Sequence, residues 1–293
     1  MKYLVTGASG FIGKNLCEYL DKNNLKYATC GRSNIEWSKE HYILDLAGRG
    51  VGEMMTDCKP DVILHLAGNA SGRPDPNKPN LVFEDNVFST HNLLLNAPKD
   101  CRFVLASTIV VYGNMTGKEF YEYNPRLPTT PYGLSKLTAE HLVRMFTSQG
   151  KVNGVCARIG ATVGKGLTHG VVYDFIKKIR NNPTTLELIG HCPGSVKPYN
   201  HVNDIINGLM CIAHTDARYT EYNLCNRDNI SILELADAVL NAMQEKRELK
   251  WLDTNWIGDN PVLKVNNNRL RSLGWKPELN SYASVLISTR ENL

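Results

Sequence analysis

The sequence predicts an α/β protein that contains a doubly wound parallel sheet and a smaller C-terminal lobe. Three observations support this fold class. Apolar, strand-like runs alternate with helical patterns through the first two thirds of the 293 residues. A glycine-rich turn directly follows the first of these runs. After Gly164 the alternation gives way to short segments rich in Gly, Pro and Asn, as expected for a lobe built from the ends of the later strands.

Each element of the expected sheet has its own pattern. Strands are expected at residues 2–6, 26–30, 41–44, 61–66, 101–107 and 152–159. Helices are expected near 11–22, 49–57, 80–97 and 131–149. This alternation produces parallel βαβ units with right-handed crossovers, in which helices cover both faces of the sheet. We expect the sheet domain to span 1–163 and the lobe 164–293, with some crossing of the chain between the two.

Composition and charge exclude several classes of protein. The net charge is only +4 and no block of Lys and Arg occurs, which argues against a nucleic-acid partner and favours a small anionic substrate. No apolar run approaches the roughly 18 residues of a membrane span, and the opening strand leaves no room for a signal peptide. The eight cysteines form neither C-x-x-C pairs nor a disulfide framework, which is typical of buried thiols in a cytoplasmic protein. No cluster has metal-ligand spacing, so no metal is expected.

The glycine-rich turn predicts a Rossmann-type site for a dinucleotide. Its spacing is G-x-x-G-x-x-G, one residue longer than the common G-x-G-x-x-G form. Glycines let the backbone approach a pyrophosphate, and the following helix points its amide groups at the negative charge. An ordinary strand-to-helix turn is the alternative, but the position directly after an opening strand favours the cofactor site. The expected contacts are Gly7, Ser9, Gly10, Phe11, Ile12 and Gly13.

The end of the second strand predicts which dinucleotide binds. An NAD site usually has an acidic residue about 20 residues past the glycines, where it accepts hydrogen bonds from the ribose 2′-hydroxyl. This chain has Arg32 there, followed by Ser33. A guanidinium and a hydroxyl suit a 2′-phosphate, so NADP(H) is favoured. If Arg32 instead stacks on adenine as a solvated residue, NAD(H) is equally possible.

Further cofactor contacts are expected after the third and fourth strands. They are Asp45, Leu46, Leu66, Ala67 and Gly68. The Asp45 carboxylate either accepts from the adenine amino group or serves as a helix N-cap, and the sequence leaves both open. Small residues after the fourth strand let the backbone lie against a ribose. His65 lies in a run of apolar residues and is interpreted as a packed strand residue.

A second motif, Tyr132-Gly-Leu-Ser-Lys136, predicts acid–base chemistry. The two side chains are four residues apart in a helical segment and therefore share one face. A lysine ammonium next to a phenol lowers the phenol pKa from its usual value of about 10, which would make Tyr132 an acid–base group. We also expect both residues to contact the cofactor. Thr108, at the carboxyl end of the fifth strand, is predicted to polarise the substrate oxygen, with Ser107 as the competing candidate.

Together these motifs resemble those of an extended short-chain dehydrogenase/reductase of the NAD(P)-dependent sugar-nucleotide epimerase/dehydratase family, over nearly the whole chain. The resemblance rests on T-G-A-S-G-F-I-G at 6–13, Asp45-Leu46, H-L-A-G at 65–68, Asn86-Val87 with Thr90 and Asn92-Leu93-Leu94, S-T-I-V-V-Y-G at 107–113, P-Y-G-L-S-K at 131–136, and segments 158–166, 197–205 and 273–277.

The resemblance implies a nucleotide-sugar substrate that contacts Thr108, Tyr132, Ala161 and Lys197. Ala161 replaces the asparagine that usually touches the sugar nucleotide, and Lys197 stands where an arginine commonly grips phosphate. In the family's 4,6-dehydratases this segment resembles the motif T-D-E, whereas here Ile109 and Val110 follow Thr108. The resemblance therefore disfavours a dehydratase. The epimerase-reductases that resemble GDP-fucose synthase have a cysteine directly after the hydroxyl residue. This chain has Ile109 at that position, which disfavours coupled epimerisation and reduction.

Two enzymatic functions therefore remain, together with one that is not enzymatic. The favoured one is an NADP(H)-dependent reductase of a nucleotide-linked 4-keto-6-deoxyhexose, with Tyr132 giving the proton. The alternative is an NAD-dependent nucleotide-sugar 4-epimerase. The third is a non-catalytic NADP(H)-binding sensor.

The resemblance also implies a homodimer formed through the two helices at 80–97 and 131–149. The candidate interface residues are Val82, Phe83, Val87, Leu94, His141, Leu142 and Met145. Arg73, in the polar loop after the fourth strand, is interpreted as a solvated residue, with closure over the substrate as the alternative.

Overall fold

The computed structural model describes residues 1–70, 77–78, 80–114, 118–254 and 261–293. Its packing divides the chain into two compact units. Unit 1 comprises Met1–Gly113, Pro125–Arg158 and Leu209–Tyr222, and unit 2 comprises Asn114–Asn124, Ile159–Gly208 and Asn223–Leu293. The chain therefore crosses between the units several times. The expected functional division at residue 163 stays a prediction, because these units are defined by packing and not by ligands.

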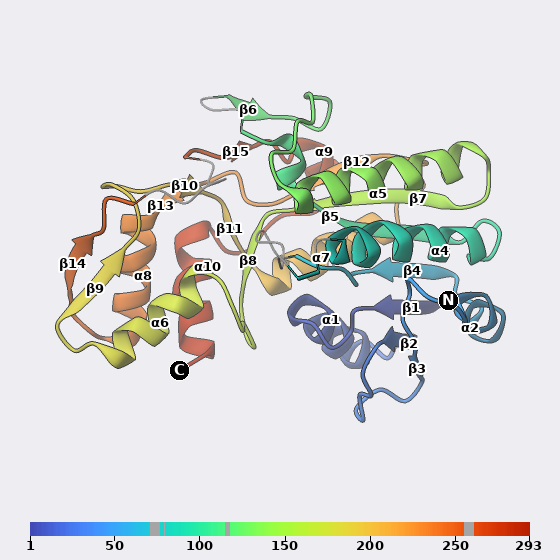
Figure 1. Cartoon of the computed structure of the whole chain (residues 1–293), viewed down its shortest axis with the longest axis horizontal. Coiled ribbons are helices and arrows are strands. Elements are labelled where there is room, and N and C mark those ends of the chain that lie inside the picture. The colour runs from blue at the N-terminus through green and yellow to red at the C-terminus, as the bar shows by residue number, and fades with distance from the viewer. Residues whose placement is uncertain (71–76, 79, 115–117, 255–260) are drawn as a thin grey trace. The chain divides into compact units, whose positions relative to one another are not determined.

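A seven-stranded sheet forms the frame of unit 1 (Figure 1). Its strand order is β12-β7-β5-β4-β1-β2-β3, and the pairs from β3 to β5 are parallel. The strands are β1 (Lys2–Thr6), β2 (Lys26–Gly31), β3 (His41–Ile43), β4 (Val62–His65), β5 (Arg102–Thr108), β7 (Asn153–Ile159) and β12 (Glu221–Leu224). The doubly wound α/β prediction is confirmed, and the six expected strands each lie within one residue of their predicted bounds.

The four predicted helices are present, and two further elements, η2 and α7, were not predicted. The helical elements are α1 (Phe11–Lys22), α2 (Val51–Cys58), α3 (Leu81–Phe83), the π-helical turn η1 (Glu84–Phe88), α4 (Ser89–Asn96), the 3₁₀ turn η2 (Ile109–Tyr112), α5 (Pro131–Ser148) and α7 (Val202–Ala213). The single helix predicted at 80–97 is a continuous run of α3, η1 and α4, and the π turn within it was not predicted.

A large hydrophobic cluster packs on one face of the sheet. Leu4, Ile63 and Phe103 project from neighbouring strands and are fully buried in one cluster with side chains of α2, α4 and α5, such as Met54 and Val143. Helices α4 and α5 pack side by side on this face (Figure 1). Helix α5 also packs on β5, and its first turn adjoins the end of that strand, since a Cβ at Gly133 would lie 3.2 Å from the Val110 carbonyl oxygen.

The cysteines are free thiols, and six of them are buried, as predicted. The buried ones are Cys17, Cys30, Cys58, Cys101, Cys156 and Cys225, whereas Cys211 is half-buried and Cys192 is exposed.

Strand β1 lies at the switch point of the sheet, with β2 on one side and β4 on the other. Ligands of open parallel sheets bind outside the carboxyl ends of the strands at such a point. The loops that leave β1 and β4 approach each other closely there, since a Cβ at Gly7 would lie 2.6 Å from the Ala67 nitrogen. The topology therefore predicts that a ligand binds at the loops after β1 and β4.

Unit 2 is built from short strand pairs and a cluster of helices. Its described strands are β6 (Glu119–Phe120), β8 (Ala161–Val163), β9 (Thr185–Leu188), β10 (Val196–Lys197), β11 (Tyr199–His201), β13 (Ile230–Ser231), β14 (Glu248–Trp251) and β15 (Lys264–Val265). They pair as β10-β13, β11-β8, β14-β9 and β15-β6. The helices are α6 (Val171–Asn181), α8 (Ile232–Met243), α9 (Asn268–Arg271) and α10 (Ser281–Glu291), and α6, α8 and α10 pack together. Within the described ranges, no helix is both long and apolar enough to cross a bilayer.

Candidate active site

The turn between β1 and α1 requires glycine at two positions for reasons of packing. Gly7 has a φ of +71°, a conformation that L-residues with a side chain rarely adopt. A Cβ at Gly13 would lie 2.2 Å from the Gly7 carbonyl oxygen. At Gly10, in contrast, the nearest protein atom to an added Cβ would be that same oxygen at 3.3 Å. Gly10 therefore leaves open space on the outside of the turn that a Cβ would partly fill.

The N-terminus of α1 is suited to an anion. Gly10 is its N-cap, and no side chain among the described residues caps it. The first N–H groups of such a helix have no intrahelical acceptor and carry a partial positive charge. The predicted contacts Ser9, Phe11 and Ile12 lie in this turn. Together with the open space at Gly10, these groups fit the pyrophosphate of a dinucleotide.

At the end of β2, Arg32 has an acidic partner that the sequence analysis missed. Its Nη1 donates a hydrogen bond of 3.0 Å to Asp85 Oδ1 in the π turn η1. The Arg32 side chain is 61% exposed, whereas that of Asp85 is 11% exposed. The neighbouring Ser33 is exposed, and its carbonyl accepts from His41 Nε2 at 3.0 Å.

Asp45 does not cap a helix. Helix α2 begins at Val51 with Gly50 as its N-cap, and Asp45 Oδ1 instead accepts from the Ala47 N–H at 2.9 Å, which forms an Asx turn. The N-cap alternative is therefore wrong, because the chain makes a further turn before the helix begins. Contact with adenine stays a prediction for Asp45 and for the buried Leu46, whose carbonyl accepts from Asn92 at 2.9 Å.

The loop after β4 is held by Thr6 and lies beside Lys136. The Leu66 N–H donates to the Thr6 carbonyl at 3.3 Å, and the Ala67 N–H donates to the Thr6 hydroxyl at 3.1 Å. Gly68 has a φ of +156°, and a Cβ there would lie 3.1 Å from the Lys136 ammonium nitrogen. The predicted cofactor contacts Leu66, Ala67 and Gly68 thus lie next to one of the predicted reacting groups.

His65 is confirmed as a packed strand residue. It is fully buried, and its two ring nitrogens hydrogen-bond with the hydroxyls of Thr6 (2.7 Å) and Thr90 (3.0 Å). Burial, with a further contribution from the Lys136 charge, lowers the pKa of His65 to about 3. The ring is therefore neutral near pH 7 and serves the packing of the strand.

Thr108, Tyr132 and Lys136 come together where β5 ends and α5 begins. Thr130 caps α5 by accepting from the Gly133 N–H at 3.1 Å, and Pro131 occupies the first helical position, so Tyr132 lies in the first turn. The Thr108 hydroxyl accepts from the Val110 N–H at 3.2 Å and is near enough to the Tyr132 phenol to lower its pKa. Lys136 follows one turn later and is 5% exposed.

The electrostatics of this group differ from the prediction. Burial raises the pKa of the Tyr132 phenol, and the nearby Thr108 hydroxyl only partly opposes it. The expectation that Lys136 brings this pKa down is wrong for this structure, in which the desolvation of the phenol dominates. Burial also lowers the pKa of Lys136 to about 8. The phenol accordingly keeps its proton at neutral pH.

A buried ion pair beneath these residues was not predicted. Glu140 and Arg158 are 1% and 0% exposed, and the guanidinium donates to both carboxylate oxygens at 2.9 and 2.8 Å. Ser107 donates to Glu140 at 2.6 Å, and Arg158 donates to the Tyr112 hydroxyl at 2.9 Å. The Ser107 hydroxyl therefore donates to Glu140 and is not the hydroxyl next to the phenol. That hydroxyl belongs to Thr108. The spacing of four from Tyr132 to Lys136 to Glu140 is the signal that could have revealed it.

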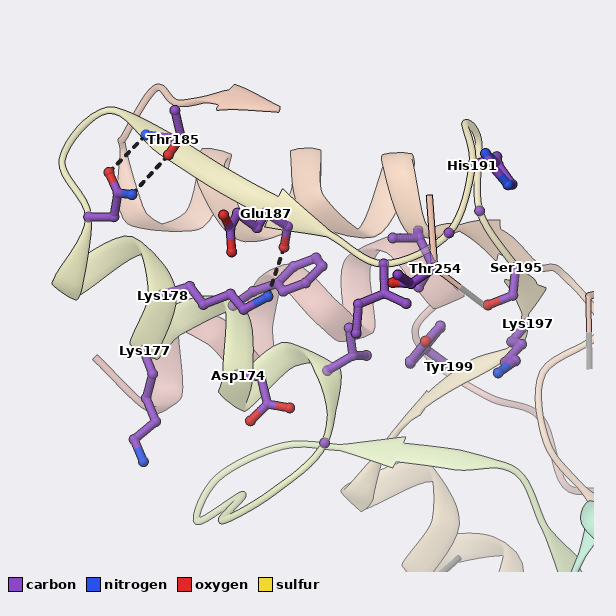
Figure 2. A pocket seen from close by; sticks show the side chains of 18 of the residues that line it. Asp174, Lys177, Lys178, Thr185, Glu187, His191, Ser195, Lys197, Tyr199 and Thr254 are labelled. Atoms are coloured by element: carbon purple, nitrogen blue, oxygen red, sulfur yellow. Dashed lines mark hydrogen bonds between the residues drawn. The ribbon is translucent and has the colours of Figure 1, made fainter. Parts of the chain in front are cut away.

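Unit 2 contains a separate pocket with a cavity volume of about 1110 Å³. Helix α6, strand β9 and the segment from Ile189 to Tyr199 contribute most of its lining, which includes Lys197, Ser195 and His191. Figure 2 shows Lys197 and Ser195 on one side of the pocket and Lys178 on the other, where its Nζ donates to the Glu187 carbonyl at 2.9 Å. The pocket therefore combines cationic side chains with apolar ones such as Phe175.

Of the two predicted substrate residues in this unit, the pocket includes only Lys197. Ala161 does not line it, and its carbonyl accepts from the Asn200 side chain at 2.8 Å. Arg73 lies outside the described residues. Within the described part of the chain, no group of three or more His, Cys, Asp and Glu side chains could hold a metal ion.

Comparisons with known proteins agree with this geometry. A family model described as "NAD dependent epimerase/dehydratase family" matches residues 3–225. The dTDP-D-glucose 4,6-dehydratase of Bos taurus is 24% identical over 95% of this chain and 84% of that protein. The dTDP-4-dehydro-6-deoxyglucose reductase of Escherichia coli is 23% identical over 94% of this chain and 92% of that protein. A crystal structure of UDP-galactose 4-epimerase superimposes with a TM-score of 0.85 at 26% identity and covers 100% of this chain and 98% of that one.

Proposed function

The chain belongs to the NAD dependent epimerase/dehydratase family, and we propose that it is an NADPH-dependent reductase of a nucleotide-linked 4-keto-6-deoxyhexose. Its relatives are nucleotide-sugar enzymes, and the chain is an NAD(P)-dependent enzyme of this kind. The observation that carries the finer proposal is Arg32 at the end of β2, where an acid would favour NAD. A net reduction consumes a reduced cofactor, and a cation at this place suits the 2′-phosphate of NADPH.

The groups around Tyr132 suit the reductive direction. When bound, NADPH would supply the hydride that reduces the keto carbon. Tyr132, whose raised pKa keeps the phenol protonated, gives its proton to the carbonyl oxygen, so that an alcohol forms. Thr108, which lies near the phenol, polarises the substrate oxygen with its hydroxyl. The phenolate that remains regains its proton from solvent.

The cofactor is held by the backbone of the glycine turn and by the loops after β2, β3 and β4. Gly7 and Gly13 shape the turn, and the α1 amides with the open space at Gly10 take the pyrophosphate. Arg32 and Ser33 would hold the 2′-phosphate, and Lys136, which lies beside Gly68 of the loop after β4, would contact the bound cofactor. A non-catalytic sensor has no support, because Thr108, Tyr132 and Lys136 are all present and together.

The pocket of unit 2 supports a nucleotide as the activating group. Lys197 offers a point charge to a diphosphate, and Phe175 offers an apolar surface to a base. We propose that this pocket binds the nucleotide part of the substrate.

An NAD-dependent nucleotide-sugar 4-epimerase is the second candidate. The hydrogen bond from Arg32 to Asp85 favours it, because a guanidinium already held by a carboxylate is less available to a phosphate. The structural similarity to UDP-galactose 4-epimerase also agrees with this function.

We further propose a homodimer formed through α4 and α5. Phe88 and Leu95, seven residues apart in one helical run, are 54% and 52% exposed, and Leu134 and Met145 of α5 are 47% and 43% exposed. Val82 and Leu94, which the sequence analysis included, are buried in unit 1 and do not belong to this surface. Sedimentation of wild type and Met145→Glu is the test, and a wild-type monomer would contradict the proposal.

The reductase is tested by cofactor titration followed by a product assay. Fluorescence titration should show NADPH binding at least about tenfold tighter than NADH in wild type, and Arg32→Ala should remove this difference, since tenfold corresponds to one good charge-assisted contact. With dTDP-4-dehydro-6-deoxyglucose as a probe, NADPH should be consumed in a 1:1 ratio with alcohol formed. Interconversion of UDP-glucose and UDP-galactose without added reductant would instead establish the epimerase.

A further inference from the structure

The Arg32–Asp85 pair joins two segments that are 53 positions apart in the sequence. Arg32 follows β2, and Asp85 belongs to the π turn between α3 and α4. The distance of 3.0 Å between Nη1 and Oδ1 is that of a direct, charge-assisted hydrogen bond. The Asp85 carboxylate therefore directly contacts Arg32, the residue proposed to bind the cofactor 2′-phosphate.

The two partners differ in how firmly they are held. The Asp85 side chain is 11% exposed, and its backbone carbonyl accepts a hydrogen bond from the Ser89 hydroxyl. The next residue, Asn86, is fully buried and bonds to both backbone groups of Asn69 and to the Ser135 hydroxyl.

These bonds tie the π turn to the loop after β4 and to α5. Arg32, 61% exposed on a long side chain, has no comparable anchoring among the described contacts. Asp85 is consequently the fixed member of the pair and Arg32 the movable one.

This asymmetry has a consequence for a 2′-phosphate. A phosphate that takes the guanidinium in the bidentate manner draws it away from Asp85 or shares it. The first leaves a mostly buried carboxylate without its cation, which costs free energy, and the second brings two anions to one cation. A ribose 2′-hydroxyl imposes neither cost, because the pair stays intact and the site stays neutral.

We propose that Asp85 is a specificity-determining residue that competes with the cofactor 2′-phosphate for Arg32. Asp85 moderates the preference for NADP(H) and keeps the site open to NAD(H). This inference rests on the proposed function, in which Arg32 reads the 2′-phosphate.

The test is a double-mutant cycle on cofactor affinity. Dissociation constants for NADPH and NADH are measured by fluorescence titration at one ionic strength for wild type, Asp85→Asn, Arg32→Ala and the double variant. Glu84→Gln is the matched control, because Glu84 precedes Asp85 on the same turn, is exposed, and loses the same charge.

Asp85→Asn is expected to raise the preference for NADPH over NADH about three- to fivefold, which is the effect of freeing a partly exposed ion pair. Arg32→Ala should abolish the preference, and Asp85→Asn added to it should change the ratio less than about twofold, because competition needs the guanidinium. Glu84→Gln should leave the ratio unchanged.

Three results would overturn the inference. An unchanged or lowered NADPH preference in Asp85→Asn, with the normal loss in Arg32→Ala, would refute the role of Asp85 alone. If Asp85→Asn changes the NADPH preference equally in the Arg32→Ala background, Asp85 acts on the phosphate through its general electrostatic field and does not compete for Arg32. If Arg32→Ala leaves the ratio unchanged, the NADPH assignment itself fails, and the competition fails with it.

Discussion

The reacting groups of unit 1 and the pocket of unit 2 are built in different ways. Tyr132 and Lys136 share one helix, and Thr108 ends the strand packed against it. The pocket draws its lining from α6, β9, the segment after β9, and positions as distant as Thr254 and Pro261. If the proposed function is correct, the reaction depends on a compact local arrangement, whereas substrate choice depends on segments spread along the chain.

The difference extends to what holds each region. Beneath the groups of unit 1 lies a fully buried, bidentate ion pair. The polar contacts of the unit 2 pocket are more exposed, such as Lys178 with the Glu187 carbonyl. Changes in unit 1 should therefore affect chemistry and stability, and changes in unit 2 should affect substrate affinity.

The largest expected effect is that of Tyr132→Phe. Loss of the proton donor should lower kcat about 10²- to 10⁴-fold, while NADPH still binds, because the phenol is only one of many cofactor contacts. Steady-state kinetics and fluorescence titration separate the two. Tyr123→Phe, at a 71% exposed tyrosine of unit 2, is the control and should be fully active. An active Tyr132→Phe enzyme would remove the assignment of chemistry to unit 1.

Glu140→Gln probes the support beneath the reacting groups. It removes the bidentate carboxylate from the buried Arg158 charge, which keeps the longer contact of 3.4 Å to Glu221, and should lower the free energy of unfolding by about 3–5 kcal/mol. Urea denaturation measures this. Glu245→Gln, in the more exposed pair with Arg247, should cost less than about 1 kcal/mol. If the two substitutions lower the free energy of unfolding equally, the buried ion pair does not stabilise unit 1 more than an exposed pair stabilises unit 2.

Two glycines of the turn separate packing from ligand binding. Gly13→Ala should destabilise unit 1, because the Cβ would lie 2.2 Å from the Gly7 carbonyl oxygen. Gly10→Ala should stay folded but bind NADPH about tenfold more weakly, because its Cβ enters the space assigned to the pyrophosphate. Thermal melting and titration together distinguish them, and normal cofactor binding by Gly10→Ala would contradict the position given to the pyrophosphate.

Lys197→Ala tests unit 2. Removal of the point charge should raise the KM for the nucleotide sugar about tenfold and leave the NADPH dissociation constant unchanged. Lys177→Ala, further along the same pocket, is the control for a general change of charge. If Lys197→Ala weakens cofactor binding instead, the separation of roles between the units is wrong.

The smallest expected effect concerns pH. Because burial lowers the pKa of Lys136 to about 8, the unfolded chain binds more protons than the native one between pH 8 and its usual value of about 10.5. The free energy of unfolding should therefore gain a contribution as pH rises through this window, and below pH 8 both states hold the proton. Relative to Lys136→Met, wild type should gain of order 1 kcal/mol between pH 7.5 and 9.5 in urea titrations. Parallel curves would contradict this.

The sequence was most informative where the signal is short. The strands, the glycine turn and the Tyr132–Lys136 spacing were predicted because the period of a strand and the turn of a helix are set within a few residues. The π turn at 84–88 was missed, since it depends on Asn86 reaching Asn69 and Ser135. The N-cap alternative for Asp45 was wrong because the start of α2 depends on the path of the loop.

Local spacing was thus enough to indicate the fold, the cofactor loop and the kind of chemistry. Folding alone decided that Asp85 meets Arg32, that Glu140 pairs with Arg158, and that burial raises the pKa of Tyr132. The physical reason is one of range. Backbone geometry acts between neighbours in the chain, whereas desolvation and charge pairing act between groups that only the packed structure brings together.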